Sequence, residues 1–152
     1  MLHIVLLEPE IPQNTGNIAR TCAALNARLH LIEPLGFKLE DRYLRRAGLD
    51  YWPLVDMATH KNLEEFLDSC PGAELFFLSS RGAKLYNETQ FPEEAFFVFG
   101  KESTGLPDEL IAANAERCLR IPMRKGVRSL NLSNSVAVVA YEYARRKGFQ
   151  KL

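Results

Sequence analysis

The chain has 152 residues, which is enough for one domain that buries about 70% of the surface of the unfolded chain. Hydrophobic residues make up 47% of the sequence and charged residues 25%, as in an ordinary globular protein. No apolar run reaches the roughly 18 to 20 residues that a membrane helix needs, so we expect no membrane partner. We predict a single domain over residues 1–152.

The first residues and the cysteines both favour a cytoplasmic protein. The apolar segment Leu2–Leu7 begins at once, without the cationic lead and cleavage site of a signal peptide. Cys22, Cys70 and Cys118 are widely spaced, odd in number and without metal-ligand spacing. We interpret them as reduced packing residues. The histidines are not clustered with carboxylates, so we expect no metal site. His3 and His30 are interpreted as hydrogen-bonded strand residues.

Charge is distributed unevenly, although the formal net charge is zero. Residues 117–152 contain nine Lys and Arg but one acidic residue, Glu142, and the excess of acidic residues lies in residues 1–116. A local positive field attracts phosphate whatever the total charge. This asymmetry indicates an anionic partner for the last third of the chain. Alternatively, these cations cover a solvated face or pair with the acidic half of a second subunit.

Short apolar segments alternate with segments of helical periodicity along the whole chain. We predict strands at Leu2–Leu7, Arg28–Ile32, Leu54–Met57, Glu74–Leu78, Ala95–Phe99 and Cys118–Ile121. We predict helices at Asn14–Asn26, Glu40–Ala47, a segment with Leu63, Phe66 and Leu67, Asp108–Ala115 and Leu132–Arg146. At the start of the first helix, Asn14 or Thr15 is expected to be the cap. The alternation predicts an α/β fold, a mostly parallel sheet with helices on both faces.

Three loops are unusually rich in Gly, Asn, Ser and charged residues, and each follows a predicted strand: Asn14–Asn17, Gly100–Gly105 and Met123–Asn134. In open α/β sheets, ligands bind beyond the carboxyl ends of the strands. None of the loops is a dinucleotide-binding or phosphate-binding glycine motif, and the chain has no G-x-S-x-G esterase elbow. The remaining polar residues suit the positioning of a hydroxyl group and the handling of its proton better than covalent catalysis.

The same three loops carry a family resemblance. The segments are N-T-G-N-I-A-R at Asn14–Arg20, F-G-K-E-S-T-G-L at Phe99–Leu106 and I-P-M-R-K-G-V-R-S-L-N-L-S-N-S-V at Ile121–Val136. In this order they resemble the three motifs of the SPOUT-class RNA 2′-O-ribose methyltransferases. The match extends from Leu2 to about Lys147. The compact length is most similar to the small branch that methylates the wobble nucleotide of leucine tRNAs.

The resemblance implies a deep trefoil knot around the third motif, which periodicity could not have shown, since true knots are nearly absent from proteins. It also implies a site for S-adenosylmethionine and a homodimer whose active site is completed across the interface. The residues implied to bind the cofactor are Leu78, Gly100, Glu102, Gly105, Ile121, Met123, Ser129 and Leu130.

The resemblance further implies which residues act on the RNA. Arg20 matches the arginine thought to help deprotonate the ribose 2′-hydroxyl. Because arginine is always protonated in water, any such role is indirect or depends on a nearby phosphate. The polar residues that match those around it are Asn14, Glu102, Ser129 and Asn131. The basic residues expected to contact tRNA are Arg42, Arg45, Arg46, Arg124, Lys125, Arg145 and Arg146.

The function implied is S-adenosylmethionine-dependent 2′-O-methylation of a tRNA at the wobble nucleotide, cytidine or uridine 34. Several alternatives stay open. The chain could methylate another tRNA or rRNA nucleotide, or act as an RNA-binding module of the same fold without catalysis, since phosphate contacts need no cofactor pocket. A SPOUT-type enzyme acting on a base nitrogen and a small-molecule enzyme are more distant alternatives.

Overall fold

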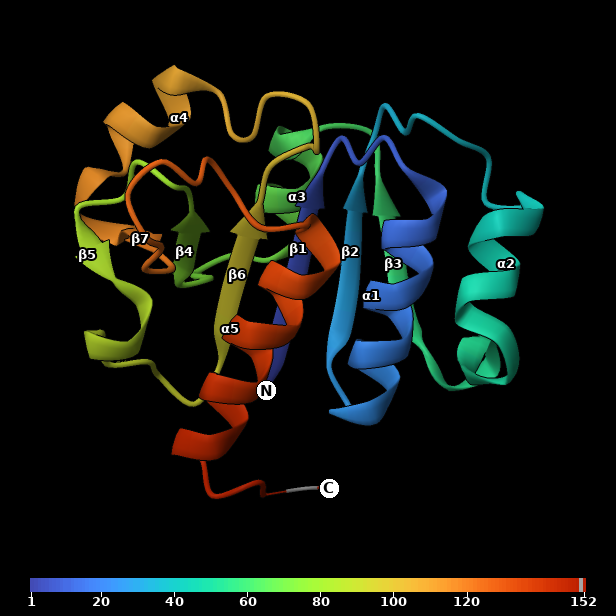
Figure 1. Cartoon of the computed structure of the whole chain (residues 1–152). Helices are drawn as coiled ribbons and strands as arrows, with labels where there is room; N and C mark the ends of the chain where they lie inside the picture. Colours follow the sequence, from blue (N-terminus) through green and yellow to red (C-terminus); the bar gives the residue numbers. More distant parts are fainter. Residues whose placement is uncertain (151) are drawn as a thin grey trace.

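The computed structural model describes residues 1–150 and 152, and within them seven strands form one sheet (Figure 1). The strands are β1 (Leu2–Leu7), β2 (Arg28–Ile32), β3 (Asp56–His60), β4 (Leu75–Leu78), β5 (Lys84–Leu85), β6 (Ala95–Phe99) and β7 (Cys118–Arg120). Their order across the sheet is β3-β2-β1-β6-β4-β7-β5, and neighbouring strands are parallel. All the carboxyl ends therefore meet at one edge.

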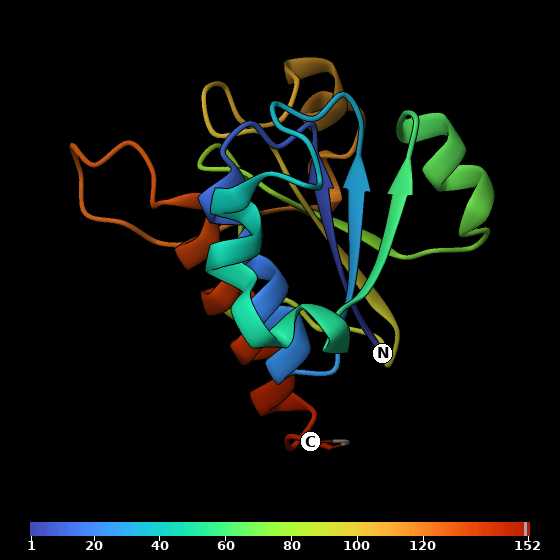
Figure 2. The same cartoon turned by 90° about the vertical axis from the view of Figure 1, so that its right-hand side faces the viewer.

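Helices cover both faces of the sheet, as Figure 2 shows. The helical segments are α1 (Pro12–Ala24), α2 (Arg42–Gly48), η1 (Leu49–Leu54), α3 (Leu63–Ser69), η2 (Tyr86–Glu88), α4 (Asp108–Ala113), η3 (Ala115–Arg117) and α5 (Leu132–Arg146). α1 and α5 lie side by side on one face, with α2 outside α1, and α3 lies on the other face. The predicted α/β architecture is confirmed. The trefoil knot stays an expectation from the resemblance.

The central strand β1 shows why its sequence is apolar without alternation. All six of its residues are buried. Ile4 and Leu6 pack in the cluster under α1 and α5, whereas Val5 and Leu7 pack in the cluster that includes Phe66 of α3. A strand buried on both faces needs apolar residues at every position. β1 is thus held in the centre of the sheet, and the segment that follows it emerges at the carboxyl edge.

The third strand was predicted too early in the chain. The prediction was Leu54–Met57, but Leu49–Leu54 form the 3₁₀ helix η1 and the strand is Asp56–His60. Pro53 has no amide hydrogen to donate to a ladder, and it lies inside η1. β3 instead pairs with β2 from Arg28↔Asp56 to Ile32↔His60. The two-residue strand β5 was not predicted.

Three histidines form a hydrogen-bonded row across β1, β2 and β3. His3 Nδ1 lies 3.0 Å from His30 Nε2, and His30 Nδ1 lies 3.0 Å from His60 Nε2. At the outer end, His3 Nε2 lies 3.1 Å from a carboxylate oxygen of Glu94. The row is satisfied when every imidazole is neutral and donates from Nε2. The interpretation of His3 and His30 as hydrogen-bonded strand residues is therefore confirmed.

The environment of the row opposes protonation. His3, His30 and His60 are all buried, and their rings pack against Phe66 and Phe96. Burial lowers the pKa of all three, that of His30 to about 3. A carboxylate at each end of the row acts to raise the pKa: Glu94 acts on His3 and Glu65 acts on His60. The positive charge of Arg28 lowers the pKa of both histidines.

The protein is expected to lose stability as the pH falls below the ordinary histidine pKa of 6.5. The pKa in the folded state is lower than in the unfolded state, so the contribution is complete above pH 6.5 and is lost on acidification. For His30 alone the loss between pH 8 and pH 5 is about 2 kcal/mol of unfolding free energy. Urea unfolding at the two pH values measures it.

The variant His30→Gln provides the control, because glutamine can still donate and accept hydrogen bonds but does not titrate. Its free energy of unfolding is expected to change less between pH 8 and pH 5, by about 2 kcal/mol, than that of the parent chain. Equal changes in the two proteins would show that His30 is not the residue responsible.

Candidate functional site

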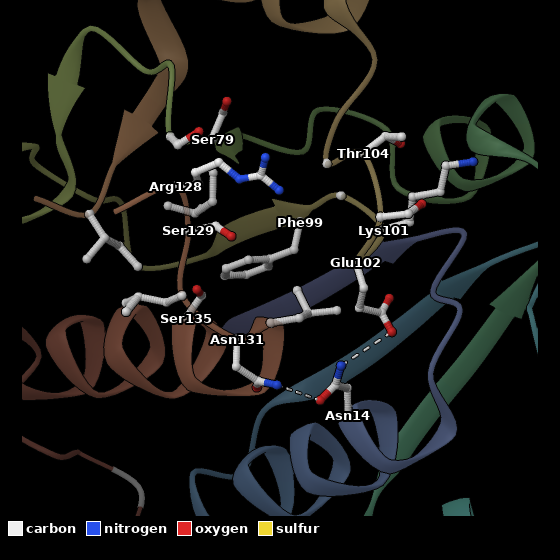
Figure 3. A pocket seen from close by; sticks show the side chains of 18 of the residues that line it. Asn14, Ser79, Phe99, Lys101, Glu102, Thr104, Arg128, Ser129, Asn131 and Ser135 are labelled. Carbon is white, nitrogen blue, oxygen red and sulfur yellow. Dashed lines mark hydrogen bonds between the residues drawn. The ribbon is translucent and has the colours of Figure 1, made fainter. Parts of the chain in front are cut away.

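The loops Gly100–Gly105 and Met123–Asn134 meet the start of α1 at the carboxyl edge of the sheet and line one pocket of about 630 Å³ (Figure 3). The prediction of Asn14–Asn17 as a loop is wrong, because these residues lie in the first turns of α1, and of them only Asn14 lines the pocket. The three segments follow β1, β6 and β7, and the residues after β4 complete the wall. This volume lies within the range of roughly 300 to 1,000 Å³ that is typical of small-molecule sites. Segments about 90 to 120 residues apart in the chain are therefore combined in one site, as the sequence predicted.

The predicted cofactor-binding residues all line this pocket. They are Leu78, Gly100, Glu102, Gly105, Ile121, Met123, Ser129 and Leu130. Phe99 and Leu132 add to the apolar part of the wall, while Ser79, Ser80 and Ser135 add hydroxyl groups. The lining thus combines apolar side chains with a larger number of polar ones, so it can hold a ligand that has both a flat apolar part and polar groups.

Glu102 joins the loop after β6 to the start of α1. One carboxylate oxygen accepts a hydrogen bond from the Glu10 amide at 3.0 Å, and the other accepts from the Ile11 amide at 2.6 Å and from Asn14 Nδ2 at 3.4 Å. The first amides of a helix have no partner within the helix, and a negative charge is favourable there. Ile11, the residue before α1, has no side-chain cap of its own. Glu102 thus caps α1 from a distant part of the chain, and the predicted cap by Asn14 or Thr15 is wrong.

A reciprocal contact strengthens the same junction. The Glu10 carboxylate accepts from the Ser103 amide at 2.9 Å and from the Ser103 hydroxyl at 2.6 Å. These two hydrogen bonds lower the pKa of Glu10. Each loop therefore supplies a carboxylate to the backbone of the other, and their separation is fixed from both sides.

Asn131 connects the third loop to the other two. Its Nδ2 donates to Asn14 Oδ1 at 3.1 Å, and its Oδ1 accepts from the Ser133 amide at 2.9 Å and the Asn134 amide at 3.3 Å (Figure 3). Asn131 is thus the N-cap of α5. Glu102, Asn14 and Asn131 form one chain of hydrogen bonds that positions the loops. A catalytic part for them stays a prediction.

The loop after β6 folds back tightly on itself. A Cβ atom at Gly100 would lie 2.1 Å from the carbonyl carbon of Gly105, so only glycine fits. Gly105 has a φ of 71° and donates its amide to the Lys101 carbonyl at 2.8 Å. These requirements explain both glycines of the second motif. They bring the backbone of the loop to the pocket wall.

Arg20 does not line the pocket of its own chain. It lies on the exposed side of α1, and its guanidinium carbon is 4.8 Å from the centre of the Tyr51 ring. Of the other residues predicted to act in catalysis, Asn14, Glu102, Ser129 and Asn131 do line the pocket. The structure therefore brings four of the five together and separates Arg20 from them.

The residues predicted to bind RNA lie outside the pocket and divide into three groups. On α2, Arg42 stacks on Tyr43, Arg45 stacks on Trp52, and Arg46 is exposed. Arg124 and Lys125 are exposed in the loop between β7 and α5, which projects from the body in Figure 2.

The third group, Arg145 and Arg146, is engaged within the chain. Both arginines pair with Glu142, whose pKa they lower to about 2. Arg146 also donates to the carbonyls of Asn87 and Thr89. Arg145 is exposed, but most of the Arg146 side chain is covered, so these cations stabilise the end of α5. Their contact with RNA stays a prediction.

Two parts of the pocket were missed by the site predictions. Residues 79–81 follow β4 at the same edge of the sheet, and their position after a predicted strand could have identified them. Arg128 lies between the predicted residues Met123 and Ser129 and also lines the pocket. No feature of the sequence sets it apart from Arg124 in the same loop. Within the described residues, no group of His, Cys, Asp and Glu could hold a metal ion, and no helix is long and apolar enough to cross a membrane.

Comparisons with known proteins identify a family and close relatives. The family model described as the SpoU rRNA Methylase family matches residues 1–141. A tRNA (cytidine(34)-2′-O)-methyltransferase of Saccharophagus degradans is 49% identical over 98% of this chain and 97% of its own. A relative from Geobacillus stearothermophilus, provisionally named for the same activity, is 51% identical over 99% of this chain and 98% of its own.

Solved structures give the same result. One from work on the 2-OH methylation of C/U34 on tRNA is 52% identical, covers 97% of each chain and has a TM-score of 0.93. The AdoMet-bound rRNA methyltransferase of Sinorhizobium meliloti is 25% identical, with a TM-score of 0.84, over 95% of this chain and 56% of its own.

Replacing Glu102 by Gln is expected to destabilise the protein. Both carboxylate oxygens of Glu102 accept hydrogen bonds from N–H donors. In glutamine one oxygen is replaced by an NH₂ group, which would point towards one of these N–H donors and could not accept its hydrogen bond. We expect the free energy of unfolding to fall by about 1 to 3 kcal/mol. Urea unfolding measures the change. Glu109→Gln, the same substitution on the exposed face of α4, is the control and should be nearly neutral. Equal effects of the two variants would argue against the capping role.

Proposed function

The chain belongs to the SpoU rRNA methylase family, and we propose that it transfers a methyl group from S-adenosylmethionine to the ribose 2′-hydroxyl of nucleotide 34 in a tRNA. The observation that carries the proposal is that residues of all three motifs line one pocket. The names of the relatives at 49% and 51% identity support nucleotide 34 as the target. We propose leucine tRNAs as the substrates, and the cytoplasm as the location.

The pocket fits S-adenosylmethionine in size and composition. Leu78, Ile121 and Met123 would pack against the flat faces of the adenine, and the backbone exposed by Gly100 and Gly105 would supply partners for its polar edge. When bound, the cofactor supplies a methyl group already activated by its sulfonium charge. The protein then has to hold the ribose oxygen in line with that methyl group and to remove one proton.

The chemistry requires the bond between sulfur and methyl to break as the bond between oxygen and methyl forms, with loss of the hydroxyl proton. Among the described residues lining the pocket, Glu102 is the only acidic one, and both its oxygens already accept hydrogen bonds. Glu102 is therefore poorly placed to take the proton. A guanidinium beside the ribose would instead stabilise negative charge on the oxygen as the proton leaves to solvent or to a phosphate.

We propose that Arg20 of a second chain supplies this guanidinium in a homodimer. Arg20 is exposed and lies outside its own pocket. On the neighbouring helix α5, Val138 and Tyr141 are exposed, 36% and 46% respectively, and their spacing places them on one face. Leu130, just before α5, is exposed as well. An apolar stripe beside an exposed arginine, whose guanidinium stacks on Tyr51 but forms no ion pair among the described residues, is suited to contact with a second copy of the chain.

The proposed activity is tested by incubating purified protein with labelled S-adenosylmethionine and unmodified bulk tRNA, followed by nuclease mapping. Label in an alkali-resistant dinucleotide is expected, because a methylated 2′-oxygen cannot attack the adjacent phosphate. The position and the tRNA are then read from the dinucleotide sequence and its parent species. Absence of both label and cofactor binding would leave the alternative of an RNA-binding module.

Arg20→Ala is expected to lower kcat for methyl transfer by about 100-fold, while the melting temperature changes little, because general acid–base and electrostatic groups contribute at this level. Single-turnover rates measure the effect. The control is Tyr51→Leu, which removes the aromatic partner but keeps the guanidinium. An equally large loss of rate in Tyr51→Leu would mean that Arg20 only maintains the surface of α1.

Mixed dimers test whether Arg20 acts across the interface. The partner variant is Ser129→Tyr, which fills the pocket with a phenol. Each variant alone should be inactive, but a random mixture should regain about a quarter of the wild-type activity, because half of the dimers are mixed and each has one complete pocket. A mixture that stays inactive, although sedimentation shows dimers, would place Arg20 in its own chain's reaction or in none.

A further inference from the structure

Two arginines line the pocket, and of these Arg128 alone has no hydrogen-bond or ion-pair partner among the described residues. Figure 3 shows its side chain extending from the third loop into the pocket above Phe99. Within the described part of the chain, it makes no hydrogen bond and no ion pair. Arg81, which also lines the pocket, is paired with Asp108. Arg128 therefore brings an uncompensated positive charge into the site.

The pocket offers nothing that would neutralise this charge. Its one acidic residue within the described chain, Glu102, is fully engaged by the amides at the start of α1. The remaining charged residue, Lys101, is also positive, and in Figure 3 its side chain points away from Arg128. Arg128 is exposed, and a guanidinium without a counter-ion attracts an anion, since its flat fork matches the oxygens of a phosphate or a carboxylate.

In the proposed reaction, two anionic groups are candidates for binding to Arg128: the carboxylate of the cofactor and a phosphodiester of the RNA. The cofactor carries a carboxylate but also a sulfonium and an ammonium group, so its net charge is positive and a further cation disfavours its binding as a whole. The RNA carries a phosphodiester on the carbon next to every ribose 2′-hydroxyl. A cation that reaches the acceptor ribose therefore lies within reach of a phosphate, and phosphate contacts position nucleic acids on proteins.

We propose that Arg128 binds the phosphodiester next to the ribose that accepts the methyl group, and so positions the 2′-hydroxyl in the pocket; this rests on the proposed function. The contact distinguishes a strand of RNA from a free nucleoside, which has no phosphate. It also assigns different tasks to neighbouring residues of the third loop: Arg128 binds substrate, while Ser129 and Leu130 face the cofactor.

Binding measurements test the proposal without relying on catalysis. Arg128→Ala is expected to weaken binding of bulk unmodified tRNA by about 10-fold and to reduce the slope of log K against log salt by about 0.7 to 0.9, the value for one phosphate contact. The dissociation constant for S-adenosylmethionine should stay within about twofold of the wild-type value, since in this proposal Arg128 contacts the RNA phosphate and not the cofactor. Arg128→Lys should retain part of the affinity, because it keeps the charge but not the fork.

The control is Lys61→Ala, which removes one positive charge from the exposed turn between β3 and α3 and should leave both affinities unchanged. Weaker cofactor binding with unchanged tRNA binding would overturn the proposal and assign Arg128 to the cofactor carboxylate. Unchanged binding of both ligands would overturn it as well. If wild-type protein binds tRNA but transfers no methyl group, the proposed function fails, while the salt dependence of Arg128→Ala still decides the phosphate contact.

Discussion

The structure depends on one carboxylate, that of Glu102, which lies against the amides of Glu10 and Ile11 at the start of α1. α1 begins with Pro12 and its N-cap, Ile11, has no side-chain cap, so the amides of Glu10 and Ile11 just before the helix would otherwise lack these partners. A loop some ninety residues later supplies the acceptor. The capping of a helix and the assembly of the pocket are therefore one event, and neither is complete without the other.

The same arrangement limits what the polar motif residues can do. Asn14, Glu102 and Asn131 look like reactive groups in the sequence because they are polar and lie in loops. In the folded chain they mainly hydrogen-bond one another and the first turns of α1 and α5. The groups left to meet ligands include the apolar side chains, the serine hydroxyls, the exposed backbone around Gly100 and the cation Arg128. Chemistry at this site thus relies on positioning more than on reactive side chains.

Much of the fold could be predicted because the central strands are buried on both faces and their apolar runs, such as Leu2–Leu7, have no other explanation. The third strand was misplaced because Leu54 and Val55 are apolar and adjacent, while the pairing with β2 that sets the register is a tertiary contact. The meeting of the loops followed from parallel topology. The position of Arg20 outside the pocket and that of Arg128 inside it could not be predicted, since the spacing of residues in the sequence does not determine which of them reach a pocket between distant segments.

The charge asymmetry was also only partly informative. Much of the positive charge of the last third is compensated within the chain, as in the pairs Arg117–Glu74 and Arg146–Glu142. A net-charge count cannot separate such cations from those left exposed. Among the described residues of the last third, the exposed cations without a carboxylate partner are Arg124, Lys125 and Arg128, all in the loop between β7 and α5.

The distance along the chain between the parts of the pocket has a consequence for the order of assembly during synthesis. β1 is synthesised first. Asn14, which follows it, can form its hydrogen bonds only after Glu102 and Asn131 have been synthesised, and Asn131 lies 117 residues further along the chain. Contacts of such long range form late and slowly. A nascent chain therefore has no complete pocket until almost its whole length has been made, so truncated products lack the site proposed for the cofactor.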